Sequence, residues 1–341
     1  MRTCEVIKAW FVILAGRVPS LSIEITKECP LRCPGCYAFD SAHLGTGLQL
    51  RNLSDYKGNE LVTRVVLLLE EHKPLHVSLV GGDPLVRHRE LELLLPAIEG
   101  LGIHTQIVTS AFRAIPRGWA RFNKLNVVVS VDGLAPEHDA RRKPATYERI
   151  LRNISGSKVN IHCTITSQIA CRHGYLEAFL HFWSGRPEVV KVWFSMFTPQ
   201  RGASDPEILT PSQRSIVIDE LMRLQKLFPV LDMPPSVLRE FATPPRIPSA
   251  CIFARTTKTV SADLLTEISP CQLGGVPDCE NCGCYASVGL AAVGHHRVLG
   301  PITAGRIFEA SYRIGTWWKS LKRSLRRMPP VQAPRPLLKV Q

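Results

Sequence analysis

The chain has no acidic residue after Glu309, although eight Lys and Arg residues follow that position. With those eight set aside, only about +5 of the formal net charge of +13 belongs to the first 309 residues. The body of the protein is therefore mildly basic and its C-terminal segment strongly so. A segment with charge of one sign favours contact with an acidic partner or surface.

Long hydrophobic runs are also missing. The N-terminal sequence MRTCEVIKAWFVILAG holds an apolar run of only about eight residues, whereas a membrane-spanning helix needs about 20. The same segment lacks a signal-peptide cleavage pattern, so we expect a cytoplasmic protein. The length of 341 residues and the hydrophobic content of 45% allow one large α/β domain and a smaller one.

Eleven cysteines would suit disulfides only in an oxidising compartment. In a reducing compartment, clustered cysteines favour metal binding. Cys29, Cys33 and Cys36 lie within eight residues of the stretch TKECPLRCPGCYAFD, residues 26–40. A zinc site here would need a distant fourth ligand. A [4Fe–4S] cluster held by three thiolates would instead leave one iron open to a small molecule.

Short β-branched runs alternate with stretches that carry an apolar stripe at helical spacing. This order predicts an α/β fold in which parallel strands joined by helices wind into a barrel or part of one. The expected strands are 21–26, 76–80, 103–110, 126–133, 159–166 and 189–196. The expected helices are 59–72, 89–100, 146–154 and 175–183.

In barrels of this type the chemistry lies at the C-terminal ends of the strands. The cysteine triplet follows the first expected strand, and GGDP (81–84) follows the second. Thr109 and Ser110 end the third strand, and SVDG (130–133) ends the fourth. These four features should therefore share one rim of the barrel.

The pattern changes near residue 197. A helix is expected over 212–228, with Thr210 or Ser212 as its cap and Pro211 in its first turn. A proline-rich link over 233–249 then leads to five further cysteines: Cys251, Cys271, Cys279, Cys282 and Cys284. The small domain around them should depend on a metal centre, because its apolar core is thin.

Taken in order, these motifs resemble the radical S-adenosylmethionine (SAM) superfamily over roughly residues 20–300. CPLRCPGCY matches the C-x3-C-x2-C-aromatic signature of that family, and GGDP resembles its GGEP motif. SVDG and the segment HDARRKPATYERILRNI (138–154) resemble members that carry extra clusters. The resemblance implies a lead-in (1–20), a partial (β/α)6 TIM-like barrel (21–232), the link (233–249), an iron–sulfur domain (250–300) and a basic tail (301–341).

The resemblance also implies site roles, with Cys29, Cys33 and Cys36 holding a [4Fe–4S] cluster that binds SAM. Asp83 is one methylene shorter than the usual Glu of its motif. Arg142 is equally explained as a solvated charge at a helix start. The implied SAM contacts are Tyr37 for the adenine, Gly81, Gly82 and Asp83 for the methionine end, and Ser130 and Arg142 for the ribose or carboxylate.

The second cysteine set resembles the auxiliary-cluster domains named SPASM or, in the one-cluster form, twitch. Five cysteines favour a single auxiliary [4Fe–4S] cluster, and a structural zinc site is the alternative. The preferred ligands are Cys251, Cys271, Cys279 and Cys282, with Cys284 as a rival for the last place. No role is assigned to Cys4, Cys163, Cys171 or the paired His295 and His296.

The basic tail contains SYRIGTWWKSLKRSLRRM, residues 311–328. Tryptophan beside a basic face is typical of a helix at a membrane interface, so we expect peripheral contact with the inner face of the membrane. Packing of the apolar stripe on the barrel is the alternative, and no nucleic-acid platform is present. The residues that share the apolar face are Ile314, Trp317, Trp318, Leu321, Leu325 and Met328.

Together these features predict a radical SAM enzyme, an oxidoreductase or radical transferase. It would cleave SAM reductively to a 5′-deoxyadenosyl radical and abstract a hydrogen atom from a peptide, a lipid or isoprenoid, or a small alcohol. An electron donor such as flavodoxin or ferredoxin would reduce the cluster. The alternative from another class is a non-catalytic zinc-binding module with a basic tail that binds membrane or nucleic acid.

Overall fold

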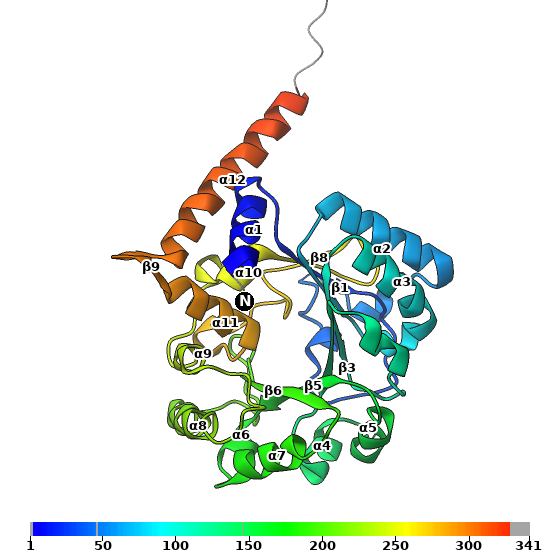
Figure 1. Ribbon diagram of the computed structural model, residues 1–341, viewed down its shortest axis with the longest axis vertical. Helices are drawn as coiled ribbons and strands as arrows, with labels where there is room; N and C mark the ends of the chain where they lie inside the picture. Colours follow the sequence, from blue (N-terminus) through cyan, green and yellow to red (C-terminus); the bar gives the residue numbers. More distant parts are fainter. Residues whose placement is uncertain (1–2, 46, 145, 328–341) are drawn as a thin grey trace, which may run out of the picture.

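A computed structural model of the chain describes residues 3–45, 47–144 and 146–327. Its centre is an eight-stranded sheet in the order β6-β5-β4-β3-β2-β1-β7-β8. Neighbours from β6 to β7 run parallel, and only the short β8 is antiparallel to β7. Helices cover the outside of this curved sheet, which makes the fold a partial α/β barrel (Figure 1).

All six predicted strands are confirmed, with small shifts at their ends. They are β1 (Ser20–Glu24), β2 (His76–Val80), β3 (His104–Thr109), β4 (Leu125–Ser130), β5 (Val159–Ile165) and β6 (Val189–Met196). The predicted helices are also present, as α2 (Gly58–His72), α3 (His88–Gly100), α5 (Tyr147–Asn153), α7 (Tyr175–Ser184) and α8 (Pro211–Leu224). Thr210 rather than Ser212 caps α8, since its hydroxyl accepts from the Gln213 backbone and its own amide donates to the Gln213 side chain.

Helix α12 (Ala304–Arg327) contains the helix expected over 311–328, apart from residue 328, which lies outside the described residues. The remaining elements had no counterpart in the sequence prediction. The helices are α1 (Thr3–Leu14), α4 (Ala135–Arg141), α6 (Ser167–Ala170), α9 (Pro235–Glu240), α10 (Ile252–Thr256) and α11 (Tyr285–His295). The strands are β7 (Thr257–Val260), β8 (Glu267–Ile268), β9 (Arg297–Leu299) and β10 (Ile302–Thr303). Because β7 pairs with β1, the C-terminal cysteine region shares the sheet of the barrel. The domain boundaries therefore stay a prediction.

The two faces of the sheet differ in polarity. Leu21 and Ile23 of β1 belong to the large apolar core beneath the helices. Since successive side chains of a strand point to opposite faces, Ser22 and Glu24 face the inside of the barrel, and both are buried. The inner side chains of β1 are thus polar.

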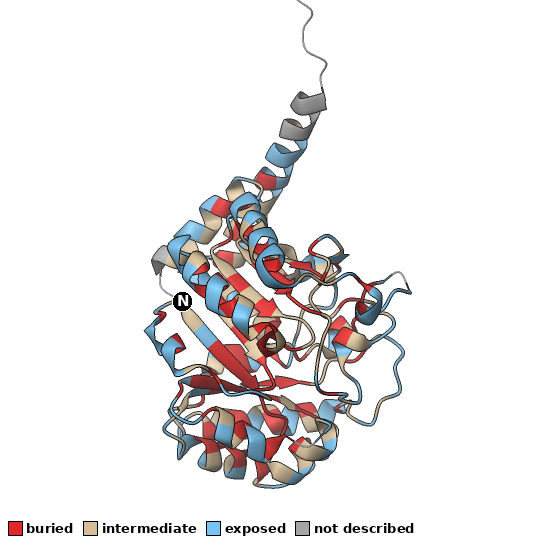
Figure 2. Ribbon diagram, turned by 90° about the vertical axis from the view of Figure 1, so that its right-hand side faces the viewer, coloured by how far each residue is buried: buried red, intermediate tan, exposed pale blue. Residues whose placement is uncertain are grey.

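Helix α12 is attached to the body through glycines. A Cβ at position 315 would lie 2.0 Å from the carbonyl oxygen of Ile13, so α12 crosses α1 at its Gly315. The buried residues in the described part of α12, which packs on both α1 and α11, are Ala304, Phe308, Ser311 and Gly315. Beyond this buried seam the helix projects from the body (Figures 1 and 2). None of the helices in the described ranges combines the length and the apolar character needed to cross a bilayer.

The crossing generates a matched pair of stability predictions. Gly315→Ala should lower the thermal unfolding midpoint, because α12 must move away from α1 at a cost of about 1–3 kcal/mol. Gly289→Ala in α11 should raise the midpoint, because alanine is more favourable than glycine in a helix by about 1 kcal/mol of unfolding free energy. A Cβ at position 289 meets nothing within 4 Å. Thermal melts of the two variants test this, and equal shifts would contradict the glycine crossing.

Candidate functional site

The cysteine triplet lies in the loop that leaves the C-terminal end of β1. The amide of Leu31 donates to Cys29 Sγ at 3.4 Å, a contact that stabilises a thiolate. Burial raises the pKa of Cys29 to about 12 and also raises that of Cys33, where Arg142 opposes the effect. These thiols therefore stay protonated at neutral pH unless a cation displaces their protons, which is how metal-binding cysteines behave.

Gly81 and Gly82 fasten this loop to the end of β2. The Gly82 amide donates to Thr26 O at 2.8 Å, and the Asp83 amide donates to Glu28 O at 2.9 Å. A Cβ at position 82 would lie 2.1 Å from Glu28 O, and Gly81 adopts φ +127°, which side chains disfavour. The two glycines thus let the second motif touch the backbone that carries Cys29.

The Asp83 carboxylate joins the second motif to the third rim feature. It accepts from Thr109 Oγ1 at 2.7 Å, from Ser110 Oγ at 2.6 Å, and from the amides of Ser110 and Leu85 at 2.8 and 3.0 Å. Asp83 is 2% exposed, and burial raises its pKa while these four donors oppose the rise. The aspartate side chain therefore has a bracing role between the ends of β2 and β3.

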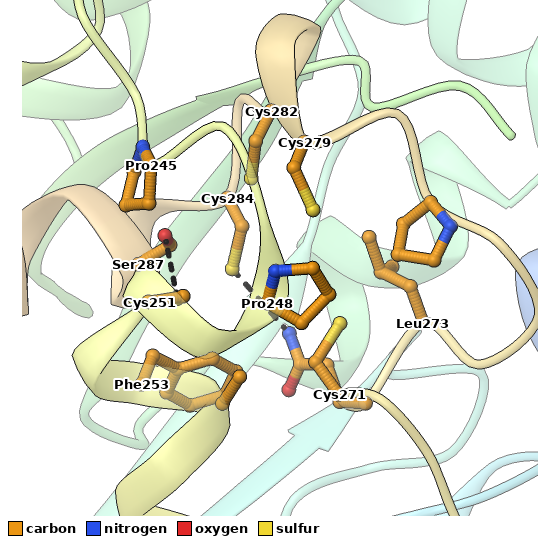
Figure 3. Close-up of a pocket in the computed structure, with 13 residues that line it drawn as sticks. Pro245, Pro248, Cys251, Phe253, Cys271, Leu273, Cys279, Cys282, Cys284 and Ser287 are labelled. Carbon is orange, nitrogen blue, oxygen red and sulfur yellow. Dashed lines mark hydrogen bonds between the residues drawn. The ribbon is translucent and has the colours of Figure 1, made fainter. Parts of the chain in front are cut away.

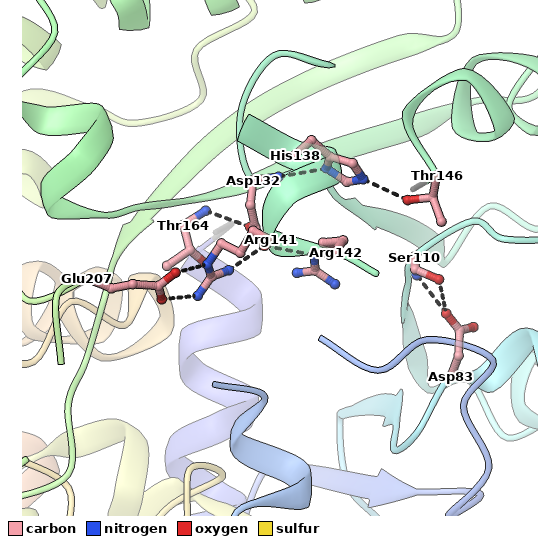
Figure 4. Close-up of polar contacts among 9 residues, drawn as sticks. All are labelled: Asp83, Ser110, Asp132, His138, Arg141, Arg142, Thr146, Thr164 and Glu207. Carbon is pink, nitrogen blue, oxygen red and sulfur yellow. Dashed lines mark hydrogen bonds and ion pairs between the residues drawn. The ribbon is translucent and has the colours of Figure 1, made fainter. Parts of the chain in front are cut away.

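Asp132 is the centre of an ion-pair cluster beside the triplet (Figure 4). Its carboxylate accepts from Arg142 Nε at 2.7 Å and from Arg141, while Arg141 also pairs with Glu207. Burial alone would raise the pKa of Asp132, but Arg142 and Arg141 hold it well below its usual range. Arg142 is thereby fixed near Cys33 and is a held charge rather than a solvated one at a helix start.

His138 supports the same corner from α4. Its Nδ1 accepts from the Asp132 amide at 3.2 Å, so its Nε2 carries the proton and lies 2.8 Å from Thr146 Oγ1. The side chain is fully buried, and burial lowers the pKa of His138 to about 4. Ser130, the last residue of β4, is buried on the adjoining rim and pairs in register with His162 of β5.

The structure also brings the five C-terminal cysteines together around one cavity (Figure 3). Burial raises the pKa of Cys271 to about 12 and that of Cys279 to about 11, and it raises those of Cys282 and Cys284 as well. In the described ranges no three Cys, His, Asp or Glu side chains form a group that could hold a metal ion.

This second cysteine group is clamped to the end of β6. The Met196 amide donates to Gly283 O at 2.9 Å, and the Gly283 amide donates to Thr198 Oγ1 at 2.8 Å. Arg214 of α8, itself buried, donates to the carbonyl oxygens of Asn281 and Cys282 at 3.2 and 3.0 Å. The loop between Cys279 and Cys284 is therefore held by the barrel.

A buried chain of contacts links the two cysteine groups. His43 Nε2 lies 2.9 Å from Glu24 Oε1 and its Nδ1 lies 3.0 Å from the carbonyl oxygen of Leu273, while Ser261 donates to Glu24 Oε2. Tyr37 packs edge-on to His43, with ring centroids 5.5 Å apart. Burial raises the pKa of the Tyr37 hydroxyl, and the charges of Glu24, Cys36 and Cys284 add to the rise. Tyr37 thus lies between the two groups.

Comparison with known proteins bears on the barrel segment. Residues 23–174 match the model of the radical SAM superfamily. This segment is a radical SAM domain. The radical SAM segment spans the triplet, the glycine motif, SVDG and Arg142, which favours an enzyme over the non-catalytic zinc module.

Solved structures with the same fold share little sequence with this chain. SuiB of Streptococcus suis bound to its precursor peptide SuiA is 16% identical, with 95% of this chain and 70% of that one covered and a TM-score of 0.53. Native anSMEcpe with bound AdoMet is 15% identical, with coverage of 91% and 100% and a TM-score of 0.53. The chain spans only 47% of another SuiB structure, at a TM-score of 0.43. No curated protein matches.

Several site residues were missed by sequence reasoning. Glu24 left a signal, since it is a charged residue in the middle of the apolar run LSIEIT. Asp132 left a weaker signal, because it lies two residues after Ser130 and nine residues before the basic run at 141–143. His43 and Ser261 left none, since only the fold brings them to Glu24.

The fit of Asp83 is tested by lengthening it. Asp83→Glu introduces the residue that the related motif usually carries, yet we expect it to reduce unfolding free energy by about 1–3 kcal/mol, because the buried carboxylate would be displaced from its four donors. Asp219→Glu on the exposed face of α8 is the control. If both substitutions leave the denaturant midpoint unchanged, Asp83 does not brace the rim.

His138 predicts a pH dependence of stability. Its folded pKa of about 4 lies below the value of about 6.5 in the unfolded chain, so the stabilisation is present above pH 6.5 and is lost as the pH falls towards 4. The loss attributable to His138 should approach roughly 3 kcal/mol. The slope of unfolding free energy against pH reports how many more protons the unfolded state binds than the folded state. Between pH 4 and 6.5 this number should be smaller by about one in His138→Gln than in the wild type. His181→Gln, at an exposed position, should leave the slope as in the wild type.

Proposed function

We propose that Cys29, Cys33 and Cys36 hold a [4Fe–4S] cluster whose open iron binds SAM. The observation that carries this proposal is the glycine-fastened triplet loop at the end of β1, with Arg142 held beside Cys33. Two features suit this group, because the half-buried thiols of Cys29 and Cys33 require a cation to ionise and a backbone amide already points at Cys29 Sγ.

When bound, the cluster supplies one electron to the sulfonium of SAM, whose C5′–S bond breaks to give methionine and a 5′-deoxyadenosyl radical that takes a hydrogen atom from the substrate. The chain positions and protects this chemistry. Tyr37 would contact the adenine, and Ser130 and Arg142 the ribose or carboxylate. Asp132 would act through Arg142 as a positioning residue.

At the methionine end, Gly81, Gly82 and Asp83 would contribute through their main chain. The Asp83 carboxylate already accepts hydrogen bonds from Thr109 and Ser110. The ligand would therefore be bound by the backbone of this motif and not by the Asp83 side chain. This arrangement explains how a shorter carboxylate can stand in the motif. The side chain positions the strand ends, and the peptide groups face the ligand.

The second cysteine group would hold one auxiliary [4Fe–4S] cluster. The preferred ligands are Cys251, Cys271, Cys279 and Cys282, with Cys284 as the rival. The cavity that all five line supports a site of this kind, and a structural zinc ion is the competing occupant. The charge of Cys284 contributes to the raised pKa of the Tyr37 hydroxyl. Cys284 would therefore lie on the side of the second cysteine group that faces the first cluster.

The substrate would be a peptide, a lipid or isoprenoid, or a small alcohol, and flavodoxin or ferredoxin would donate the electron. Structures of SuiB with SuiA and of anSMEcpe with a Cys peptide favour the peptide class. We place the protein in the cytoplasm, with peripheral membrane contact through residues 311–328. Leu325 and Met328 of the predicted apolar face lie outside the described side chains.

Iron content and SAM cleavage test both clusters. The protein reconstituted anaerobically should hold about eight irons and release 5′-deoxyadenosine when a strong reductant and SAM are added. Cys29→Ala should abolish release and keep about four irons. Cys251→Ser should also keep about four, and Cys284→Ser should keep all eight if Cys284 is the spare cysteine.

Cys171→Ser, at an exposed cysteine outside both groups, is the matched control and should behave as the wild type. Full SAM cleavage by Cys29→Ala would refute the first cluster. Zinc in place of the second set of irons would keep the enzyme and remove the auxiliary cluster.

A further inference from the structure

The apolar stripe of α12 is separate from the face with which this helix packs. The buried seam consists of Ala304, Phe308, Ser311 and Gly315. Ile314, Trp317 and Trp318 are instead 47%, 59% and 44% exposed. At 100° per residue, Ile314 and Trp317 lie about a quarter-turn or more from the centre of the seam, whereas Trp318 lies at its edge, beyond Gly315, the last buried residue among the described side chains of the helix. Packing on the barrel, the alternative that the sequence left open, therefore does not account for the tryptophans.

The surroundings of this face are basic. Arg306, Arg313 and Lys319 lie on the described turns of α12, and the helix continues to Arg327 through sequence that adds further Lys and Arg. The adjacent α1 exposes two more large apolar side chains, Ile7 (43%) and Phe11 (67%). Arg313 is paired with Glu309, but Lys319 and the basic residues beyond it leave an excess of positive charge. Exposed tryptophan next to such an excess suits the headgroup region of an anionic bilayer.

The position of this face in the barrel is defined by α1. Gly16, just after α1, contacts Gly315 and the Lys319 Cβ, and the chain enters β1 at Ser20. Lys319 also acts on His72, the last residue of α2, whose pKa is lowered by burial and by Lys258 and Lys319. His72 and Ser20 both mark the N-terminal ends of strands. The tryptophan face therefore belongs to that end of the barrel, whereas Cys29 follows the C-terminal end of β1.

We propose that Ile314, Trp317 and Trp318 seat the protein on an anionic lipid bilayer with the N-terminal ends of the barrel strands towards the membrane. The cysteine rim then faces the aqueous phase. This orientation, which rests on the proposed SAM site at the rim, assigns the substrate to the water-borne classes, a peptide or a small alcohol. An isoprenoid in the bilayer would lie at the N-terminal ends of the strands, at the opposite end of the barrel from the cysteine rim.

Vesicle binding tests the surface. The full chain should sediment with vesicles of phosphatidylglycerol and phosphatidylcholine, less with pure phosphatidylcholine, and less as salt is raised. Trp317→Ser combined with Trp318→Ser should weaken partition about tenfold or more. The control is Leu265→Ser combined with Val276→Ser, two apolar residues outside α1 and α12 that are at least as exposed as the tryptophans. The control should bind as the wild type.

Hydrogen exchange on the vesicles tests the orientation. Peptides of α1 and α12 should gain protection, and peptides of the triplet loop (26–40) should not. Protection of the triplet loop in place of α12 would overturn the orientation. Neither measurement needs SAM, so a failure of SAM cleavage leaves the result intact.

Other outcomes would overturn the lipid surface itself. One is wild-type binding by the tryptophan double variant. Another is a wild-type dimer in solution that this variant converts to monomers, because a second copy would then cover the face. A third is protection of α12 from exchange by residues 328–341. In that case removal of these residues would abolish the protection, and the wild type would not bind vesicles.

Discussion

The backbone contact between the triplet loop and the end of β2 is the constraint on which the site depends. Gly82 allows the two chains to approach so closely that a single Cβ would collide with Glu28 O. The amides of Gly82 and Asp83 then bond to the loop that carries Cys29. Because the loop is tied to the sheet at this point, its cysteines sit on the rim and not in solvent.

Buried charge extends this constraint around the barrel. Asp83 connects the ends of β2 and β3, and Asp132 holds Arg142 beside Cys33. Glu24 and His43 reach across to Ser261 and Leu273 of the C-terminal region. The three carboxylates, those of Asp83, Asp132 and Glu24, are each buried and hydrogen-bonded, as a carboxylate taken out of water must be. The two cysteine groups are therefore parts of one rim built on a common sheet.

Much of the fold could be predicted from local patterns. The six strands were visible because strand signals and helix periodicity depend on neighbouring residues. Strand β7 was not, since TKTV is short and gains its place only by pairing with β1, more than 200 residues earlier. Helix α1 was missed because its apolar side chains are explained by packing against α12, at the far end of the described chain.

The sequence by itself determined the chemistry that is available: the spaced thiols of Cys29, Cys33 and Cys36, the glycines at 81 and 82, and the excess of positive charge after Glu309. Tertiary structure decided which groups meet. It gathered five separated cysteines around one cavity, gave Glu24 a partner in His43, and left Trp317 and Trp318 exposed. The physical reason is range: residue type and spacing act locally, whereas burial and ion pairing depend on segments that only the folded sheet brings together.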